Sequence, residues 1–206
     1  MNRIRVLLVD DHAMIRMGIA SLLGTRKEIE VIGDAEDGET AIRKTMKLRP
    51  DVVIMDLLMP GMDGAETTQR LLEKSPDAKI LILTTFGTAN GIAHALEAGA
   101  RGAILKNSGT EDLVRAIRTV YDGKRYLAAE IEQILSRNPP VPELSPRQSE
   151  ILASVTQGLS NETIAKQLGI SLPMVKEHLK ILFAKIGATN RTEAVAIALR
   201  KHLLKI

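Results

Sequence analysis

The chain has 206 residues, of which 45% are hydrophobic and 26% are charged, an ordinary globular composition that excludes a disordered or fibrous protein. It contains no cysteine, which excludes a disulfide framework, a thiolate zinc site and a thiol nucleophile. Its charge is uneven: residues 145–206 hold nine Lys and Arg against four Asp and Glu, whereas residues 1–144 have a small acidic excess. A basic C-terminal part fits nucleic-acid binding and fits a solvated helical surface equally well.

Two further absences narrow the class of protein. No apolar run approaches the ~18 residues of a membrane span, and the N-terminus lacks the core of a signal peptide. We therefore expect a soluble cytoplasmic protein without a membrane partner. The chain has two Tyr, two Phe and no Trp, which argues against binding of single-stranded nucleic acid by aromatic stacking.

The first part of the chain alternates apolar runs with helical patterns. The apolar runs cover residues 4–10, 29–35, 52–55, 79–84 and 102–105, and the helical patterns cover residues 12–23, 39–48, 64–74, 91–98 and 110–121. This alternation predicts an α/β domain with a doubly wound, five-stranded parallel sheet. In such a sheet, binding groups belong at the carboxyl ends of the strands.

The alternation stops after Tyr121. Residues 122–144 contain one short helical pattern, residues 128–135, and then a segment with three prolines, which predicts a linker over residues 123–142. Beyond it, helical periodicity covers residues 146–157, 162–168, 173–186 and 192–203, and predicts a small all-α domain. Asn161 and Ser171 are the predicted N-caps of its second and third helices.

Five polar residues follow the predicted strands directly: Asp10, Asp11, Asp56, Thr84 and Lys106. Three carboxylates at neighbouring strand ends repel one another unless a cation is present, and hard oxygen ligands suit Mg²⁺. An ammonium group and a hydroxyl could bind the oxygens of a transferring phosphoryl group. Taken singly, any of these aspartates is as easily a helix N-cap. Together they predict a phosphoryl-transfer site.

The residues beside this cluster are interpreted as structural. His12 is interpreted as a surface residue at the start of a helix, in preference to a metal ligand. Pro60, Gly61, Asp63 and Gly64 are interpreted as residues that shape the turn after Asp56, because Pro and Gly set the backbone angles of tight turns.

The motifs VDDH (9–12), MDLLMPGMDG (55–64), LTTF (83–86) and AILKN (103–107) together resemble the response-regulator receiver family, a flavodoxin-like fold, over residues 1–122. The resemblance implies a phosphoprotein whose phosphoryl donor is a sensor histidine kinase, and a domain that catalyses only its own phosphorylation and dephosphorylation. It implies these roles: Asp56 is the phosphoacceptor, Asp11 and Asp56 bind Mg²⁺ directly, Asp10 binds it through water, Leu58 binds it through its backbone carbonyl, and Thr84 and Lys106 contact the phosphoryl group.

Three residues depart from the receiver pattern. Ala103 stands where the family commonly has an aromatic switch residue, so the usual coupling between Thr84 and an aromatic ring is in doubt. Leu58 and Phe86 stand at positions that influence the attacking water in the family. Neither side chain can orient water by hydrogen bonding, and we hypothesise slow loss of the phosphoryl group.

The C-terminal part has the pattern of a helix-turn-helix, because the helices predicted over residues 162–168 and 173–186 are joined by only a few residues. The motifs LSPRQ (144–148), GLSNETIA (158–165), VKEHLKILFAKIG (175–187) and NRTEAV (190–195) resemble the LuxR-type DNA-binding domain of NarL/FixJ regulators, over residues 143–206. Double-stranded DNA is the expected partner.

Lys176, Glu177 and Lys180 are the candidates for reading bases, since lysine can address guanine acceptors and glutamate can accept from cytosine N4. The alternative is a solvated charged face of the helix. Met174 departs from the family, which usually has Thr there, so a hydroxyl contact to phosphate is lost.

Other cations of this part, Lys166, Lys185 and Arg191, are candidates for sequence-independent phosphate contacts. The last predicted helix presents a small apolar face, which either caps its own domain or pairs with a second copy on DNA. That face consists of Ala194, Val195, Ala198 and Leu199.

These features predict a transcriptional response regulator in a two-component system. A kinase would phosphorylate Asp56, and phosphorylation would separate the receiver from the DNA-binding domain and favour a homodimer on DNA. RNA polymerase is a further candidate partner. Three alternatives are an orphan DNA-binding regulator that is never phosphorylated, a Mg²⁺-dependent phosphatase with Asp56 as nucleophile, and a protein-interaction adaptor.

Overall fold

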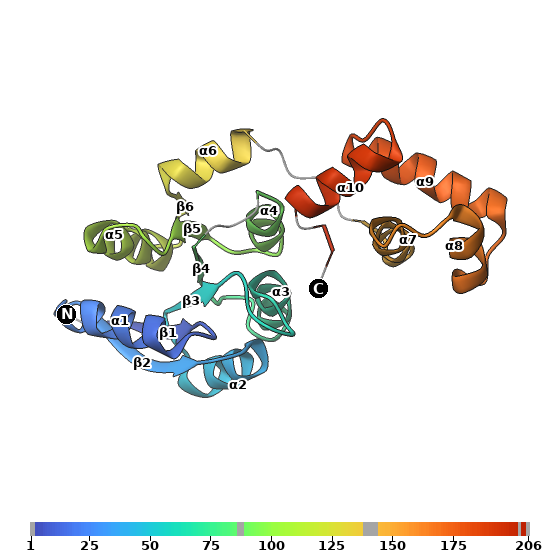
Figure 1. The fold of residues 1–206 in the computed structure, drawn as a ribbon. Helices are drawn as coiled ribbons and strands as arrows, with labels where there is room; N and C mark the ends of the chain where they lie inside the picture. Colours follow the sequence, from blue (N-terminus) through green and yellow to red (C-terminus); the bar gives the residue numbers. More distant parts are fainter. Residues whose placement is uncertain (1–2, 86–88, 138–143, 202, 205–206) are drawn as a thin grey trace. The chain divides into compact units, whose positions relative to one another are not determined.

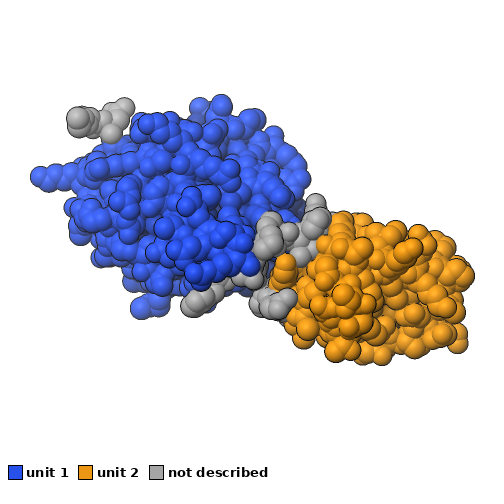
Figure 2. Space-filling model, turned by 90° about the horizontal axis from the view of Figure 1, so that it is seen from above, with its two compact units in different colours: residues 1–138 blue, residues 139–206 orange. Residues whose placement is uncertain are grey.

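The computed structural model describes residues 3–85, 89–137, 144–201 and 203–204, and the chain divides into two compact units, residues 1–138 and 139–206. The ribbon of Figure 1 shows the elements of the two units, and Figure 2 colours the units separately. Each unit has its own hydrophobic core. None of the helices in the described ranges is both long enough and apolar enough to cross a membrane.

The first unit is a parallel sheet between two layers of helices, with strand order β2-β1-β3-β4-β5-β6. The strands are β1 (Ile4–Val9), β2 (Ile29–Ala35), β3 (Val52–Asp56), β4 (Ile80–Thr84), β5 (Gly102–Leu105) and β6 (Tyr126–Leu127). The helices are α1 (Ala13–Gly24), α2 (Gly38–Leu48), α3 (Gly64–Lys74), α4 (Ala89–Glu97), α5 (Thr110–Tyr121) and α6 (Ala129–Arg137). Helices α1 and α5 cover one face, and α2, α3 and α4 cover the other (Figure 1). The predicted doubly wound sheet is confirmed, with a sixth strand beyond the five expected.

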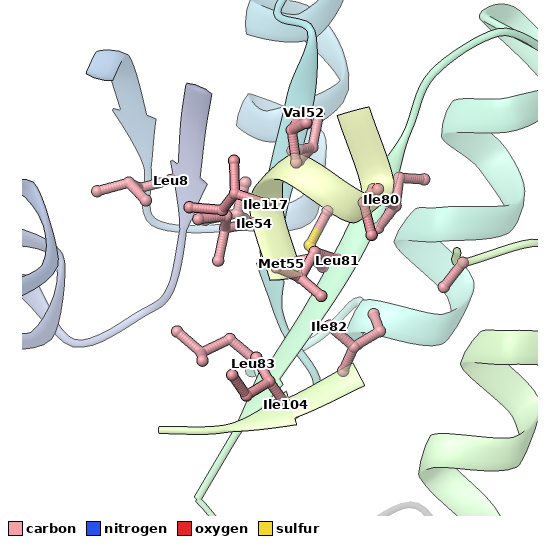
Figure 3. Close-up of a cluster of buried hydrophobic side chains, with 14 of the residues drawn as sticks. Leu8, Val52, Ile54, Met55, Ile80, Leu81, Ile82, Leu83, Ile104 and Ile117 are labelled. Carbon is pink, nitrogen blue, oxygen red and sulfur yellow. The ribbon is translucent and has the colours of Figure 1, made fainter. Parts of the chain in front are cut away.

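The centre of this unit is built from the apolar runs seen in the sequence. All residues of β3 and β4 are buried, because helices cover both faces of these strands. Figure 3 shows side chains of four strands meeting there, among them Leu8, Ile54, Leu81 and Ile104, together with Ile117 of α5. A rigid central sheet therefore carries the residues at its carboxyl edge.

The sixth strand and α6 lie in the segment expected to be linker, residues 123–142. The backbone N–H of Ala128 donates to the carbonyl of Ala103 at 3.1 Å, which ties this segment to β5. Ile131 of α6 is fully buried in the core of the first unit. Residues 126–137 are thus regular structure on the edge of the sheet, and the expected linker stays a prediction for the proline-rich residues, most of which lie outside the described ranges.

The described residues of the second unit form four helices around a separate core, as predicted: α7 (Pro146–Thr156), α8 (Asn161–Leu168), α9 (Leu172–Ile186) and α10 (Arg191–Arg200). Gly169 ends α8 with φ of 63°, a left-handed conformation that favours glycine, and this turn lets α9 start three residues later. Ser171 caps α9, as predicted, and Pro173 stands in its first turn.

The N-cap predicted for α8 was wrong by one residue. Ser160 is the cap, and its hydroxyl accepts from the backbone N–H of Thr163 at 3.2 Å, whereas Asn161 is already the first helical residue. Both residue types are good caps, so the choice depends on the backbone, and Ser160 has the extended conformation that a cap requires.

Candidate functional site

The parallel register brings the polar residues at the strand ends to one edge of the sheet. Strands β3 and β4 lie side by side between β1 and β5, and the strands end at Asp10, Asp56, Thr84 and Lys106 or one residue before them. Asp10 and Asp56 are each 3% exposed, and Thr84 is fully buried. The predicted phosphoryl site is therefore a single cluster of groups that are largely removed from water.

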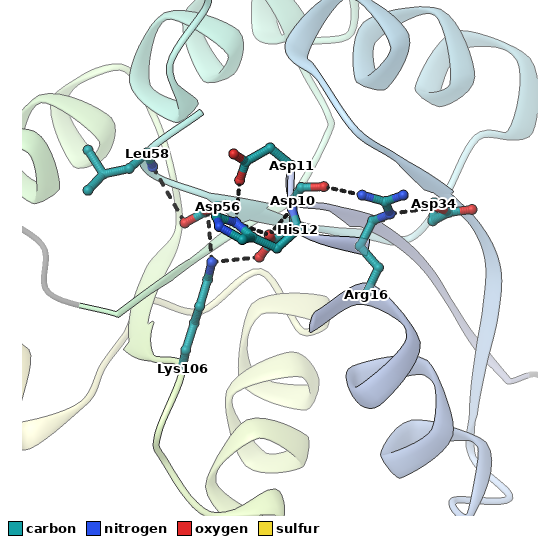
Figure 4. Close-up of polar contacts among 8 residues, drawn as sticks. All are labelled: Asp10, Asp11, His12, Arg16, Asp34, Asp56, Leu58 and Lys106. Atoms are coloured by element: carbon teal, nitrogen blue, oxygen red, sulfur yellow. Dashed lines mark hydrogen bonds and ion pairs between the residues drawn. The ribbon is translucent and has the colours of Figure 1, made fainter. Parts of the chain in front are cut away.

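Lys106 links the two buried carboxylates. Its Nζ lies 2.8 Å from Oδ2 of Asp56 and 2.6 Å from Oδ2 of Asp10 (Figure 4). These side chains come from three strand ends and lie far apart in the sequence, so the fold alone brings them together. The ammonium group compensates charges that would otherwise be costly to bury.

Burial raises the pKa of the Asp56 carboxyl, and the negative charge of Asp10 adds to this effect, while Lys106 opposes it. Burial by itself would lower the pKa of Lys106, but hydrogen bonds and charge from Asp10 and Asp56 outweigh it and raise that pKa. Lys106 is consequently held as a cation beside a carboxylate that is more basic than an exposed aspartate.

Asp11 and His12 extend the cluster on the side away from Lys106. Ligand atoms of Asp10, Asp11, His12 and Asp56 all lie within 4.8 Å of one another. Three carboxylates make a hard oxygen donor set, which fits Mg²⁺. Imidazole is less suited to that ion.

The position of His12 was predicted correctly, but its contact with the cluster was missed. His12 caps α1 without a side-chain capping bond, and its backbone N–H donates to Oδ1 of Asp10 at 2.8 Å. Its exposed imidazole Nδ1 lies 2.7 Å from Oδ1 of Asp11. Arg16, one helical turn later, was also missed: its guanidinium donates to the carbonyl of Asp10 at 2.6 Å and to the Asp34 carboxylate at 2.8 Å (Figure 4). The sequence signal that could have identified Arg16 is a cation about one helical turn after the acidic pair Asp10 and Asp11.

Leu58 and Thr84, both near Asp56, differ in their hydrogen bonding. The backbone N–H of Leu58 lies 3.4 Å from Oδ1 of Asp56, and its side chain is exposed and directed away from the carboxylate (Figure 4). Oγ1 of Thr84 is buried and makes no hydrogen bond within the described part of the chain. Buried hydroxyls normally have a partner, so an orphaned one at this position is informative.

The turn after Asp56 has the structural role expected of it. Gly61 has a φ of 75°, and the carboxylate of Asp63 accepts from the backbone N–H of Glu66 at 2.8 Å, which caps α3. A Cβ on Gly64 would lie 2.2 Å from the backbone oxygen of Asp56. Glycine is therefore required where α3 begins directly behind Asp56.

Ala103 of β5 lies beside β6 and the start of α6. It is fully buried, and its carbonyl accepts from Ala128 just before α6. Phe86, which enters the hypothesis of slow phosphoryl loss together with Leu58, lies outside the described residues, so that hypothesis stays a prediction.

Helix α9 exposes the three residues predicted to read bases, Lys176, Glu177 and Lys180. The opposite side of this helix packs into the core of the second unit through Val175, Leu179, Leu182 and Ile186. The helix is thus amphipathic, with its charged side free of core contacts.

The three candidate phosphate contacts have different surroundings. Lys166 is exposed, whereas Nζ of Lys185 lies 3.3 Å from Oε1 of Gln148. Arg191 is partly buried and donates to the carbonyls of Val155 and Leu159 at 3.3 and 2.6 Å, at the C-terminal end of α7. Such a position suits a cation near a helix C-terminus, so Arg191 has a structural role there whatever its role on DNA.

The apolar face predicted for α10 is divided between core and surface. Ala194 and Ala198 are buried in the second unit's own core, whereas Leu199 is 63% exposed. The two alanines therefore cap their own domain, as one of the two interpretations expected.

Comparison with known proteins agrees with both motif sets. The model of the response regulator receiver domain matches residues 6–118, and that of bacterial regulatory proteins of the luxR family matches residues 142–198. The chain is 38% identical to the transcriptional regulatory protein LiaR of Bacillus subtilis (strain 168) and 37% identical to the oxygen regulatory protein NreC of Staphylococcus epidermidis (strain ATCC 35984). Each alignment covers 98% of this chain and 99% of the relative.

Solved structures give the same result. The response regulator ChrA of a heme-sensing two-component system is 38% identical, with a TM-score of 0.60 over 99% of this chain and 100% of that chain. The response regulator RcsB in complex with DNA is 27% identical, with a TM-score of 0.68 over 97% of this chain and 99% of that chain. The chain therefore belongs to the two-component response regulators that join a receiver domain to a LuxR-type helix-turn-helix DNA-binding domain.

Proposed function

We propose that a sensor histidine kinase phosphorylates Asp56 of this transcriptional regulator, and that phosphorylation promotes homodimerisation and binding to double-stranded DNA. The observation that carries this proposal is the pairing of Lys106 with Asp56 and Asp10 beside the orphaned Thr84 hydroxyl. It forms one site with a nucleophile, a cation and a hydrogen-bond donor.

The residues of the site suit phosphoryl transfer. An oxygen of Asp56 would attack phosphorus while the bond from phosphorus to the donor nitrogen breaks, and the ammonium of Lys106 would pair with a phosphoryl oxygen. The hydroxyl of Thr84 would donate to another of these oxygens and so gain the partner it lacks. Asp10, Asp11, Asp56 and the backbone carbonyl of Leu58 would hold Mg²⁺, which would neutralise charge on the phosphoryl oxygens.

The DNA-binding part of the proposal rests on α9. Its exposed Lys176, Glu177 and Lys180 would contact base edges in the major groove, and Lys166, Lys185 and Arg191 would contact phosphates. Solved structures of RcsB include a DNA complex and two dimers bound to two parallel DNAs, which supports a dimer on DNA for this chain. RNA polymerase would be a further partner of the bound dimer, and such a regulator would act in the cytoplasm.

The test compares the wild type with Asp56→Asn, using acetyl phosphate and Mg²⁺ as the phosphoryl source. Phosphorylated protein is quantified by mass spectrometry, and DNA affinity is measured with and without the donor. We expect a gain of one phosphoryl group and tighter DNA binding in the wild type, and neither in the variant. The exposed Asp122→Asn is the matched control and should behave as the wild type.

Two results would contradict the proposal. Labelling of Asp56→Asn at the wild-type level would move the acceptor to another residue. Normal labelling of the wild type with an unchanged DNA affinity would instead indicate a regulator whose DNA binding is independent of phosphorylation.

A further inference from the structure

Helix α9 exposes two large apolar side chains among its charged residues. Met174 is 49% exposed and Ile181 is 47% exposed. Within the described residues of the second unit, one other large hydrophobic side chain, Leu199 of α10, is exposed to a comparable extent. Two of these three thus lie on the helix that the proposed function assigns to DNA.

The spacing of these residues places them on one line. Met174, Glu177 and Ile181 are three and four residues apart, so they follow one another along the same side of the helix. Lys176 and Lys180 lie four residues apart on the adjoining side. The exposed surface of α9 therefore has an apolar edge, Met174 and Ile181, and a cationic edge, Lys176 and Lys180, with Glu177 between them.

We propose that Met174 and Ile181 read thymine, each by contact with a C5-methyl group in the major groove. This inference rests on the proposed function of α9 as the DNA-reading helix. The thymine methyl is the apolar group that a base pair presents in that groove, and apolar side chains are suited to contact it. Met174 and Ile181 are seven residues apart, which on a helix is on the order of 10 Å, or about three base-pair steps.

The charges around the apolar edge favour DNA over a protein partner. Each apolar side chain is within two residues of a lysine, and both lysines are exposed. A second protein copy would have to cover these cations, whereas the major groove of DNA supplies guanine acceptors for them. Two side chains also form a patch far smaller than the roughly 800 Å² that each partner contributes to a stable protein interface.

The experiment uses full-length protein phosphorylated with acetyl phosphate and Mg²⁺, and duplexes that this protein enriches from a random-sequence library. Each thymine of an enriched duplex is replaced in turn by deoxyuridine, which removes only the methyl group. We expect affinity to fall about fourfold per contacted methyl group, at two positions about three base pairs apart in each half-site bound by one copy of the dimer.

Variants then assign each position to a residue. Ile181→Ala and Met174→Ala should each bind the thymine and deoxyuridine duplexes equally at one of the two positions, and still discriminate at the other. Both side chains are half-exposed, so both variants should keep the wild-type circular dichroism spectrum. Met46→Ala, which removes a similarly exposed methionine of α2, is the control and should keep the wild-type discrimination at both positions.

The outcomes separate this inference from the proposed function. If the protein enriches no duplex, both are overturned. If it enriches duplexes but binds thymine and deoxyuridine alike, or if the alanine variants keep the wild-type discrimination, only this inference is overturned. Alanine variants that discriminate normally but no longer dimerise would identify the apolar edge as a protein contact.

Discussion

Asp56 is a buried carboxylate whose charge is compensated by one lysine. Its 3% exposure removes most of its hydration, and the ion pair with Lys106 restores part of the lost stabilisation. Asp10 competes for the same ammonium group. One ammonium group therefore compensates two buried carboxylates, so negative charge is left over unless a second cation binds. This excess charge affects stability as well as chemistry.

The excess negative charge predicts that the free energy of unfolding depends on pH. Burial raises the pKa of Asp56 above its ordinary value of 3.8, so the folded protein keeps a proton at pH values where the unfolded chain has lost it. The stabilisation from this proton is lost as the pH rises from 3.8 through the raised pKa of the folded state. At neutral pH the ionised carboxylate then lowers the free energy of unfolding.

Asp56→Asn should therefore stabilise the protein at neutral pH in the presence of EDTA, by on the order of 1 kcal/mol. The gain should shrink as the pH falls toward about 4. Thermal unfolding followed by circular dichroism measures this, with Asp122→Asn as the control. Equal melting temperatures of the wild type and Asp56→Asn at every pH would rule out a destabilising charge at Asp56.

Helix α8 is short, so its first turn contributes much of its stability. The hydroxyl of Ser160 satisfies the N–H of Thr163. We expect Ser160→Ala to destabilise α8 by about 1 kcal/mol, and Asn161→Ala to have a much smaller effect. Hydrogen exchange of the α8 amides in the full-length chain measures both variants. If Asn161→Ala destabilised α8 as much as Ser160→Ala, the assignment of the N-cap to Ser160 would be wrong.

The edge of the sheet at β5 is closed by β6 and α6. Ala103 is fully buried there, at the position where the receiver family commonly carries an aromatic switch. Because β6 and the start of α6 pair with this part of β5, we expect Ala103→Tyr to force α6 away from the sheet, at a cost of about 1–3 kcal/mol. Relative to the wild type, the variant should then show a larger increase in hydrogen exchange in residues 129–137 than in α3. Unchanged protection of α6 would mean that the ring is accommodated elsewhere.

At the scale of the whole molecule, the two units have separate cores. The first core includes Ile131 of α6, so its natural boundary lies after α6 and not after α5. We expect a fragment of residues 1–138 to unfold cooperatively and to be phosphorylated as the full chain is.

A fragment of residues 1–122 should be less stable by about 2 kcal/mol or more, because it lacks Ile131 and leaves apolar surface of β5 uncovered. Urea unfolding of both fragments measures the difference. Equal stabilities would show that β6 and α6 add nothing to the first unit.

The sequence by itself determined the parallel sheet, the all-α second unit and the residues of the acidic cluster. Strands covered on both faces must be continuously apolar, so β3 and β4 were visible as runs that end at Asp56 and Thr84. The amphipathic pattern of α9 likewise separated Val175 and Leu179 from the exposed lysines. These features follow from local periodicity.

The tertiary structure alone decided which groups touch and which surfaces are covered. It placed Lys106 between Asp10 and Asp56, and folded residues 126–137 onto β5, where a two-residue strand has no periodicity to reveal it. It also buried Ala194 and left Leu199 exposed on the same predicted face. Such choices depend on contacts between distant parts of the chain, because the packing of neighbouring elements fixes them and local pattern does not.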